Sequence, residues 1–229
     1  MKYAVLSDVH ANYPALEAVV ADFSEDVDGV IYVGDVVGLM GFPEEVVTEL
    51  MEIADHAVKG NHDVAVVERE EGHVNSDELS KFELELTHSN LSNTHTDWVA
   101  SLSAYEEVPE EGLLIAHAKP TPEKAIGIGL RNSGVRKRKF TQVAANVDTD
   151  VFDYVFLGHT HQQAALDCAQ FGNDVTVVNP GSVGQPMGTA EYATVDTETG
   201  EVNLHTVKYD KQAVIDRLER EGVPEKWWN

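Results

Sequence analysis

Short apolar runs recur along the 229-residue chain, and polar residues close each of them. The runs are rich in β-branched residues and are bounded by turn residues, which is typical of strands buried on both faces. Histidine, aspartate or asparagine stands at or near the end of every run. The sequence therefore predicts strands within residues 3–10 (YAVLSDVH), 29–35 (GVIYVGD), 56–63 (HAVKGNHD), 113–117 (LLIAH) and 154–161 (YVFLGHTH).

Helical stretches separate the first three runs. In residues 14–23 and 43–54, apolar side chains recur on one helical face, and Pro14 stands early in its stretch, as is common where helices begin. Alternation of strand and helix implies right-handed crossovers and a parallel sheet.

The remaining segments predict further helices and a β-rich end. Residues 64–104 are mostly polar and favour helices, and residues 121–150 are irregular to helical. Towards the C-terminus the pattern turns to strands, with a hairpin turn at 198–201 and a last helix at 211–222. We expect one domain over residues 1–229, an α/β fold of two face-to-face sheets with helices outside and a helical insert at about 64–104.

The charge balance is extreme: 40 acidic residues oppose 16 basic ones, a formal net charge of −24. Such a surface disfavours nonspecific binding to nucleic acids or anionic membranes. The acidic excess also suggests a halophilic host, because molar salt shortens the Debye length to about 3 Å and screens self-repulsion. The apolar content of 42% still supports a folded core.

The number of cysteines and the hydropathy of the chain limit the compartments in which the protein is expected. Cys168 is the only cysteine, so we expect a small buried residue rather than a disulfide or a thiolate zinc cluster. No apolar stretch is long enough to span a membrane, and Asp8 precedes any signal-like region. We therefore expect a cytoplasmic protein. Whether it forms a homo-oligomer is left open by the sequence.

Histidines and carboxylates are concentrated at the predicted strand ends. Side chains of a strand alternate with a period of two, so Asp8 and His10 are expected on one face. The same spacing puts His159 and His161 on one face of another strand. Because ligands gather beyond the carboxyl ends of parallel strands, we expect the polar residues of five strand ends to converge. These residues are Asp8, His10, Asp35, Asn61, His117, His159 and His161.

The chemistry of this set predicts a metal centre. A single histidine or aspartate after a strand is usually structural, but five strand ends in series favour a function. Imidazole and carboxylate together suit Mn, Fe, Zn and similar divalent ions better than Ca or Mg. Seven ligands suit two ions with one shared carboxylate. Asp35 is the candidate for sharing, because a carboxylate has two oxygens and an imidazole offers one accessible nitrogen.

The order of five short motifs resembles the calcineurin-like metallophosphoesterase superfamily, and within it the small minimal prokaryotic phosphoesterases. The superfamily signature is D-x-H, G-D-x-x, G-N-H-D/E, H and G-H-x-H. The matching residues are Asp8–His10, Gly34–Val37, Gly60–Asp63, His117 and Gly158–His161. The chain also shares NPGSVGQP at 179–186, and the resemblance covers roughly residues 1–207.

The resemblance implies a four-layer α/β/β/α sandwich, two mixed sheets with flanking helices, and a dinuclear metal centre. One ion would be held by Asp8, His10, His161 and the shared Asp35. The second ion would be held by Asp35, Asn61, His117 and His159. His62 would then be the catalytic imidazole rather than a ligand. Asp63 would orient His62 or, as an equal alternative, cap the helix that follows.

In function, the resemblance implies hydrolysis of a phosphomonoester or phosphodiester by a metal-bound hydroxide, with His62 as general acid. Manganese is the first expectation for the two ions, with Fe, Zn, Co or Ni as alternatives. The substrate would be a phosphorylated small molecule or a nucleotide. The alternative is a non-catalytic protein-interaction module on the same fold, but the complete ligand set and His62 favour the enzyme.

Basic residues near the motifs are candidates for binding substrate phosphate. Lys119 stands just after the fourth motif, and Arg136 and Arg138 belong to the basic segment 131–139. A solvent-exposed lysine and a solvated helix face are the alternative interpretations. The loop after the second motif, GDVVGLMGFP, lacks the acidic or asparagine-rich partner that several relatives place near the catalytic histidine.

The charge balance generates a first prediction. The midpoint of urea unfolding should rise as KCl is increased from about 0.1 M to about 1 M and above, because the Debye length falls from about 10 Å to about 3 Å. Urea is the suitable denaturant, since it adds no ions of its own. A midpoint that stays constant or falls over this range would contradict a halophilic origin.

Overall fold

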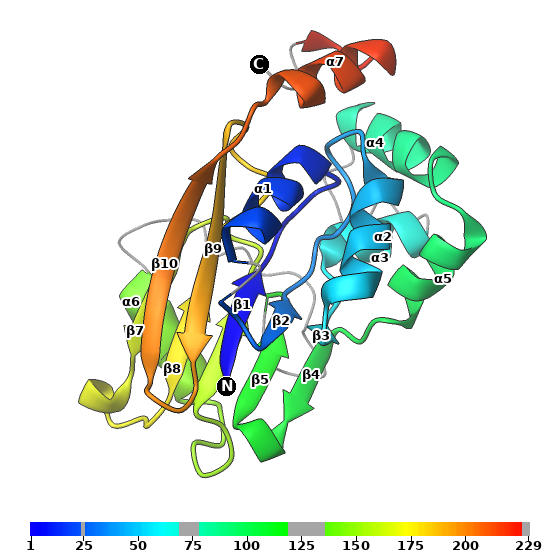
Figure 1. Ribbon diagram of the computed structural model, residues 1–229. Helices are drawn as coiled ribbons and strands as arrows, with labels where there is room; N and C mark the ends of the chain where they lie inside the picture. The colour runs from blue at the N-terminus through cyan, green and yellow to red at the C-terminus, as the bar shows by residue number, and fades with distance from the viewer. Residues whose placement is uncertain (24–25, 69–77, 119–135, 226–229) are drawn as a thin grey trace.

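Two five-stranded sheets pack face to face in the computed structural model, which describes residues 1–23, 26–68, 78–118 and 136–225 (Figure 1). The strands of the first sheet are, in spatial order, β10 (Glu201–Lys208), β9 (Thr189–Asp196), β1 (Lys2–Leu6), β2 (Gly29–Tyr32) and β3 (His56–Ala57). β1 pairs in parallel with β2 and antiparallel with β9, so the sheet is mixed.

The second sheet is mixed as well. Its strands are, in spatial order, β4 (Tyr105–Val108), β5 (Leu113–Ala116), β6 (Tyr154–Leu157), β8 (Thr176–Asn179) and β7 (Ala164–Asp167). β5, β6 and β8 run parallel, and the antiparallel strands β4 and β7 flank them at the two edges.

Helices cover the outer faces of both sheets. α1 (Tyr13–Phe23) and α2 (Pro43–Ile53) pack on the first sheet, and α6 (Arg136–Ala144) packs on the second. The other described helices are α3 (Asn61–Glu68), α4 (Glu78–Ser89), α5 (Asn93–Ser101), α7 (Gln212–Arg220) and the short 3-10 helices η2 (Pro109–Glu111) and η4 (Ala169–Phe171). The described part of the segment between β3 and β4 is mainly helical, as predicted. None of the described helices combines the length and the apolar character that crossing a bilayer requires.

The alternation of side chains along each strand builds the layers. In β1, Tyr3 and Val5 belong to the core between the two sheets. Their neighbours Ala4 and Leu6 pack in the core under α1 and α2 instead. β5 and β6 alternate in the same way between the central core and the core under α6. The result is the predicted four-layer α/β/β/α sandwich.

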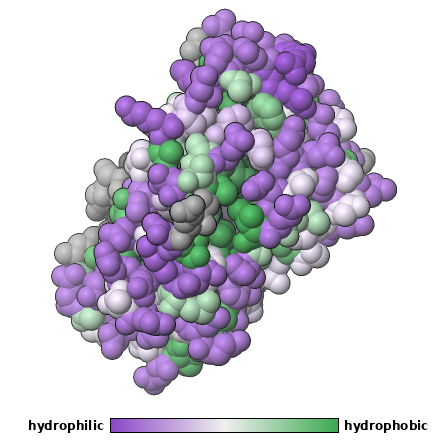
Figure 2. Space-filling view, viewed as in Figure 1, coloured by the Kyte–Doolittle hydropathy of each residue, from purple (hydrophilic) through white to green (hydrophobic). Residues whose placement is uncertain are grey.

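The surface and the cysteine agree with the composition. Figure 2 shows a mostly hydrophilic face, with apolar residues gathered near the middle of that view. Cys168 is buried in the core between α6 and the second sheet, as expected for a small apolar residue.

The observed strands are shorter than the predicted ones. β1 ends at Leu6 and β6 ends at Leu157, so the polar residues that follow lie in loops. The predicted strand 56–63 is wrong beyond Ala57, because Asn61 begins α3. The edge strands β4 and β7, with the sequences YEEV and AALD, were not predicted, because two adjacent glutamates interrupt the first and the second is a short, partly exposed segment that ends in Asp167. The one-domain organisation stays a prediction.

A hydrogen-bonded pair joins the edges of the two sheets. Nδ1 of His56 on β3 lies 2.8 Å from Oε1 of Glu106 on β4. The hydrogen bond with Glu106 raises the pKa of His56, and the charges of Glu111 and Asp55 add to this effect against the opposing effect of burial. The ring of Tyr3 packs edge-on against His56, with ring centroids 6.4 Å apart.

Replacing His56 with glutamine should therefore reduce stability in a pH-dependent way. Because the folded-state pKa is raised, the protonated pair stabilises the fold fully below the unfolded value of about 6.5. This contribution is lost as pH rises through the folded-state pKa. The loss of unfolding free energy, at most about 1 kcal/mol for a partly exposed pair, should be larger at about pH 6 than at about pH 9 in urea titrations.

The matched control for this prediction is His205→Gln, since the His205 ring bonds to the hydroxyl of Thr194 rather than to a carboxylate. The control gives the loss caused by removing an imidazole whose partner is not a carboxylate. A pH-independent loss for His56→Gln would show that the pair with Glu106 does not stabilise the protein through its charge.

Candidate functional site

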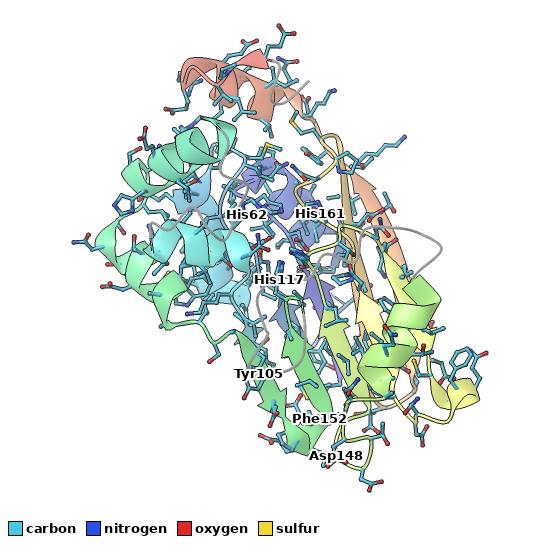
Figure 3. The ribbon with its side chains drawn as sticks, turned by 180° about the vertical axis from the view of Figure 1, so that it is seen from behind. His62, Tyr105, His117, Asp148, Phe152 and His161 are labelled. Carbon is cyan, nitrogen blue, oxygen red and sulfur yellow. The ribbon has the colours of Figure 1, made fainter. Side chains whose placement is uncertain are left out.

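The structure brings the seven predicted ligands together beyond the ends of the strands. Asp8 and His10 follow β1, Asp35 follows β2, Asn61 begins α3, His117 follows β5, and His159 and His161 follow β6. In Figure 3, His62, His117 and His161 lie close together in the middle of the molecule. Five segments that are far apart in the sequence thus meet at one place.

The expectation that strand alternation aligns these side chains is wrong, because they lie in tight turns. Among the described residues, seven other than glycine have a positive φ, between 51° and 65°. Five of these seven are predicted ligands: Asp8, His10, Asp35, His159 and His161. Left-handed backbone costs of order 1–3 kcal/mol at each such residue and clusters at functional sites. The turns, and not the period of the strands, aim the side chains at a common centre.

Asp8, His10 and His161 form the first candidate metal group. Nε2 of His161 lies 3.1 Å from Oδ1 of Asp8 and 3.0 Å from Nε2 of His10. Nε2 of His10 is 3.8 Å from the same Asp8 oxygen. Two ligand atoms that are each about 2.0–2.2 Å from one ion lie roughly 3–3.5 Å apart, so the two shorter separations match atoms that share an ion.

Asp35, His117 and His159 form the second candidate group, with ligand atoms within 4.8 Å of one another. Nε2 of His117 lies 3.1 Å from Oδ2 of Asp35. Asp35 also forms a group with His10 and His62, on the side of the first candidate group. Asp35 therefore connects the two groups, which is the position expected of a shared ligand.

Burial and hydrogen bonding of these atoms fit a metal-binding role. Asn61 is buried, with its Oδ1 2.7 Å from Nδ1 of His159. Oδ1 of Asp8, Nδ1 of His10 and Nε2 of His117 are buried without a hydrogen bond of good geometry to the described residues. Native proteins rarely leave such atoms unsatisfied, and a metal ion is a common reason when they do. The donor atoms of Asp8 and His117 thus fit bound ions.

Opposite charges in the cluster keep its carboxylates ionised. Burial alone would raise the pKa of Asp35, but the imidazoles of His117 and His62 hold that pKa well below its usual value. Burial is likewise outweighed at Asp8, whose pKa is lowered chiefly by His117. Conversely, Asp35 and Asp8 overcome burial and raise the pKa of His117 to about 10. Burial, followed by the charge of His62, lowers the pKa of His10 to about 3, so His10 is a neutral donor.

Neighbouring groups orient the ligand atoms. Oδ2 of Asp8 accepts hydrogen bonds from the Ser7 hydroxyl at 2.5 Å and from the His159 N–H at 3.0 Å, so Oδ1 is left for the cluster. Nδ1 of His117 donates to the Val33 carbonyl at 2.7 Å, so Nε2 is the ring nitrogen that faces the cluster. Neither partner was predicted. The hydroxyl of Ser7 beside the motif aspartate was an available signal, whereas no sequence signal marks a backbone carbonyl.

The NPGSVG turn supports two loops of the site. The Ser182 hydroxyl and the Gly184 N–H both donate to the carbonyl of Asp8 at 2.9 Å. Nδ2 of Asn179 donates to the Gly158 carbonyl at 2.8 Å, next to the histidines that follow β6. This shared motif therefore fixes the first and last ligand loops rather than serving only as a turn.

Asp63 is fully buried and binds backbone N–H groups. Its Oδ2 accepts from Asp35 at 2.9 Å and from Gly60 at 2.8 Å, and its Oδ1 accepts from Val37 at 3.1 Å. The bond to Gly60 caps the first turn of α3, as in a capping box. Burial, followed by the charge of Asp35, raises the pKa of Asp63 to about 7. These contacts match the helix-capping alternative for Asp63.

His62 lies beside the candidate metal groups. Its N–H donates to Oδ1 of Asp35 at 2.8 Å, and its ring packs edge-on against the ring of His10 with centroids 4.8 Å apart. The side chain is partly exposed, so a molecule bound at the cluster would reach it. Such a group is suited to exchanging a proton with a ligand of the site.

The predicted phosphate-binding residues are not tested. Lys119 lies outside the described residues. Arg136 and Arg138 belong to α6, but their side chains are outside the described part of the structure. Their role stays a prediction.

Comparisons with known proteins agree with the fold and the motifs. A family model described as the calcineurin-like phosphoesterase superfamily domain matches residues 1–200. A solved metallophosphoesterase from Sphaerobacter thermophilus is 26% identical, with a TM-score of 0.81, and 100% of this chain and 96% of that one are covered. A hypothetical protein from Pyrococcus horikoshii also has a TM-score of 0.81, at 20% identity over 99% of this chain and 96% of that one. An uncharacterized protein of Methanocaldococcus jannaschii is 26% identical over 247 residues, covering 97% of this chain and 93% of that protein.

Asp63→Ala should lower the unfolding free energy by about 2–4 kcal/mol, because it leaves buried backbone N–H groups without an acceptor. Asp63→Asn, which keeps one oxygen acceptor, should cost less. Asp216→Ala on the exposed face of α7 is the control and should change stability by no more than about 0.5 kcal/mol. Urea unfolding measures all three, and a loss below about 1 kcal/mol for Asp63→Ala would mean that water replaces the carboxylate.

Proposed function

Because the chain belongs to the calcineurin-like phosphoesterase superfamily, we propose that it is a metal-dependent hydrolase of phosphomonoesters or phosphodiesters. One observation carries the proposal: segments far apart in the sequence bring imidazole and carboxylate groups together, and several of the buried polar atoms of these groups lack a hydrogen bond of good geometry. The strained turns at five of the ligand positions support it, since such strain persists where function requires it.

The proposed centre takes two divalent ions. The first would bind Asp8, His10, His161 and the shared Asp35. The second would bind Asp35, Asn61, His117 and His159. Mn²⁺ is the proposed metal, and the same donors accept Fe, Zn, Co or Ni. When bound, the ions would supply positive charge to phosphate oxygens and a nucleophile from water at neutral pH.

The acidic surface is compatible with an anionic substrate. Two divalent ions outweigh the two charges of Asp8 and Asp35, so the site would be locally positive within a chain of net charge −24. The proposed substrate is therefore a phosphorylated small molecule or a nucleotide. A nucleic acid is disfavoured, because its backbone would meet the surrounding acidic surface. The halophilic host, the cytoplasmic location and any homo-oligomer stay predictions.

His62 is the proposed general acid. Its backbone is fixed to Asp35 and its ring is partly exposed beside the cluster. The protonated ring would donate to the oxygen of the leaving alcohol, a role typically worth about 10²–10⁴-fold in rate. Asp63 is proposed to act as a positioning residue that fixes the turns carrying His62 and Asp35.

A substrate panel in Mn²⁺ and high KCl tests the proposal. Aryl and alkyl phosphate monoesters and diesters are assayed with the wild type, His62→Ala and Asp35→Asn. His62→Ala should lower kcat on alkyl esters by about 10²–10⁴-fold. Asp35→Asn should remove activity and lower the amount of bound Mn²⁺. His205→Ala is the matched control, because that ring bonds Thr194 away from the cluster, and it should keep wild-type rates.

Two outcomes would contradict the proposal in different ways. Equal activity of all variants would reveal a contaminating hydrolase. Two bound metal ions without hydrolysis of any ester would favour the non-catalytic interaction module on the same fold.

A further inference from the structure

Gly38 lies close to the imidazole ring of His62. A Cβ at position 38 would stand 2.8 Å from Nδ1 and 3.3 Å from Cγ of the His62 ring. Carbon atoms do not normally approach a ring that closely, so any side chain at position 38 would displace the imidazole or the loop. Gly38 also has a φ of +94°, which favours glycine.

The loop that carries Gly38 is tied to the first ligand loop. The Met40 N–H donates to the carbonyl of His10 at 3.0 Å, and the Phe42 N–H donates to the carbonyl of Ala11 at 3.0 Å. On the side of α3, the Val37 N–H donates to Asp63. Hydrogen bonds on both flanks of Gly38 therefore limit its movement.

Helix α7 closes the outer side of the same loop. Val214 and Leu218 of α7 form a buried cluster with Met40. The guanidinium of Arg217 lies over the ring of Phe42, 5.5 Å from its centroid. These contacts oppose an outward shift of the loop. A Cβ at position 38 would therefore displace the His62 side chain rather than the loop.

The His62 ring also packs against His10. The ring of His10 packs edge-on against it, at a centroid distance of 4.8 Å. The imidazole thus packs against His10 and lies within contact distance of a Cβ placed at position 38. These packing contacts take the place of the polar partner that the GDVVGLMGFP loop lacks.

We propose that Gly38 is a positioning residue that aims the His62 imidazole at the leaving-group oxygen by close contact of its backbone with the ring. The proposal rests on the proposed function of His62 as general acid. Proton transfer requires the donor within hydrogen-bond reach of the acceptor, so a small displacement of the ring lowers its efficiency. The loss should be greatest for alkyl esters, whose alcohols leave poorly without a proton. Esters of 4-nitrophenol, whose phenolate leaves readily, should be affected least.

The test compares Gly38→Ala with Gly172→Ala. Gly172 has a similar φ of +86°, and a Cβ there would meet nothing within 4 Å. Both variants thus acquire a similar backbone strain, but only the new Cβ of Gly38→Ala would meet His62. In Mn²⁺, Gly38→Ala should lower kcat on an alkyl phosphate by about 10–100-fold and on a nitrophenyl phosphate by less than about 3-fold. KM, bound metal and the shift in Tm should match those of Gly172→Ala.

A double-mutant cycle separates positioning from a general structural effect. In the His62→Ala background, Gly38→Ala should cause no further loss of kcat, because the two residues act as one unit. A loss that persists in this background, or an equal loss on both classes of ester, would overturn the proposal.

The third readout does not depend on activity. The ring ¹H–¹⁵N signals of His62 in the metal-free protein, assigned by their absence in His62→Ala, should shift in Gly38→Ala and not in Gly172→Ala. Unchanged signals would overturn the positioning role. If the wild type hydrolyses no ester but the signals shift, the contact is established and the proposed function alone fails.

Discussion

Asp8 and Asp35 keep two negative charges inside the protein, and the site is organised around this constraint. A buried carboxylate is tolerated only where opposite charge and hydrogen bonds surround it. Backbone N–H groups, the Ser7 hydroxyl and the imidazole of His117 provide both. The N–H and hydroxyl partners bind one oxygen of each carboxylate, Oδ2 of Asp8 and Oδ1 of Asp35, so the other oxygen of each faces the imidazoles of the cluster. That arrangement is one that divalent cations would complete.

The sandwich supplies the rigidity that the arrangement needs. The Asp8 N–H donates to the Gly34 carbonyl at 2.9 Å and the His10 N–H donates to the Asp35 carbonyl at 3.0 Å, so the loops after neighbouring strands are joined directly. Left-handed residues persist where the surrounding structure over-determines them, and well-packed cores lie on both faces of each central strand. The first sheet contributes Asp8 and the second contributes His117. The site therefore forms only when the two sheets pack together.

The sequence predicted the layers and the clustered residues, because their signals are local. Apolar runs mark buried strands, and Asp8 or His117 after such a run marks a strand end. The prediction that strand alternation aligns these side chains was wrong. Nothing in the sequence distinguishes a strand that continues to His10 from a tight turn that begins at Asp8. The edge strand β4 was missed because its two adjacent glutamates give it the polar pattern of a loop. The closeness of Gly38 to the His62 ring and the hydrogen bond of Ser182 to Asp8 both join segments that are distant in the sequence, and no local pattern encodes them.

The order of the strands bears on how the chain is made. β1 is central in its sheet, yet its antiparallel neighbour β9 comes from residues 189–196. At about 5–20 residues per second, β1 waits roughly 10–40 s on the ribosome for that partner. All seven candidate ligands have been synthesised by then, but the strand that pairs with β1 and helps to position them has not. A chain that ends before β9 would therefore carry all seven candidate ligands without the strand that pairs with β1, and the geometry of the site would come only with the last quarter of the polypeptide.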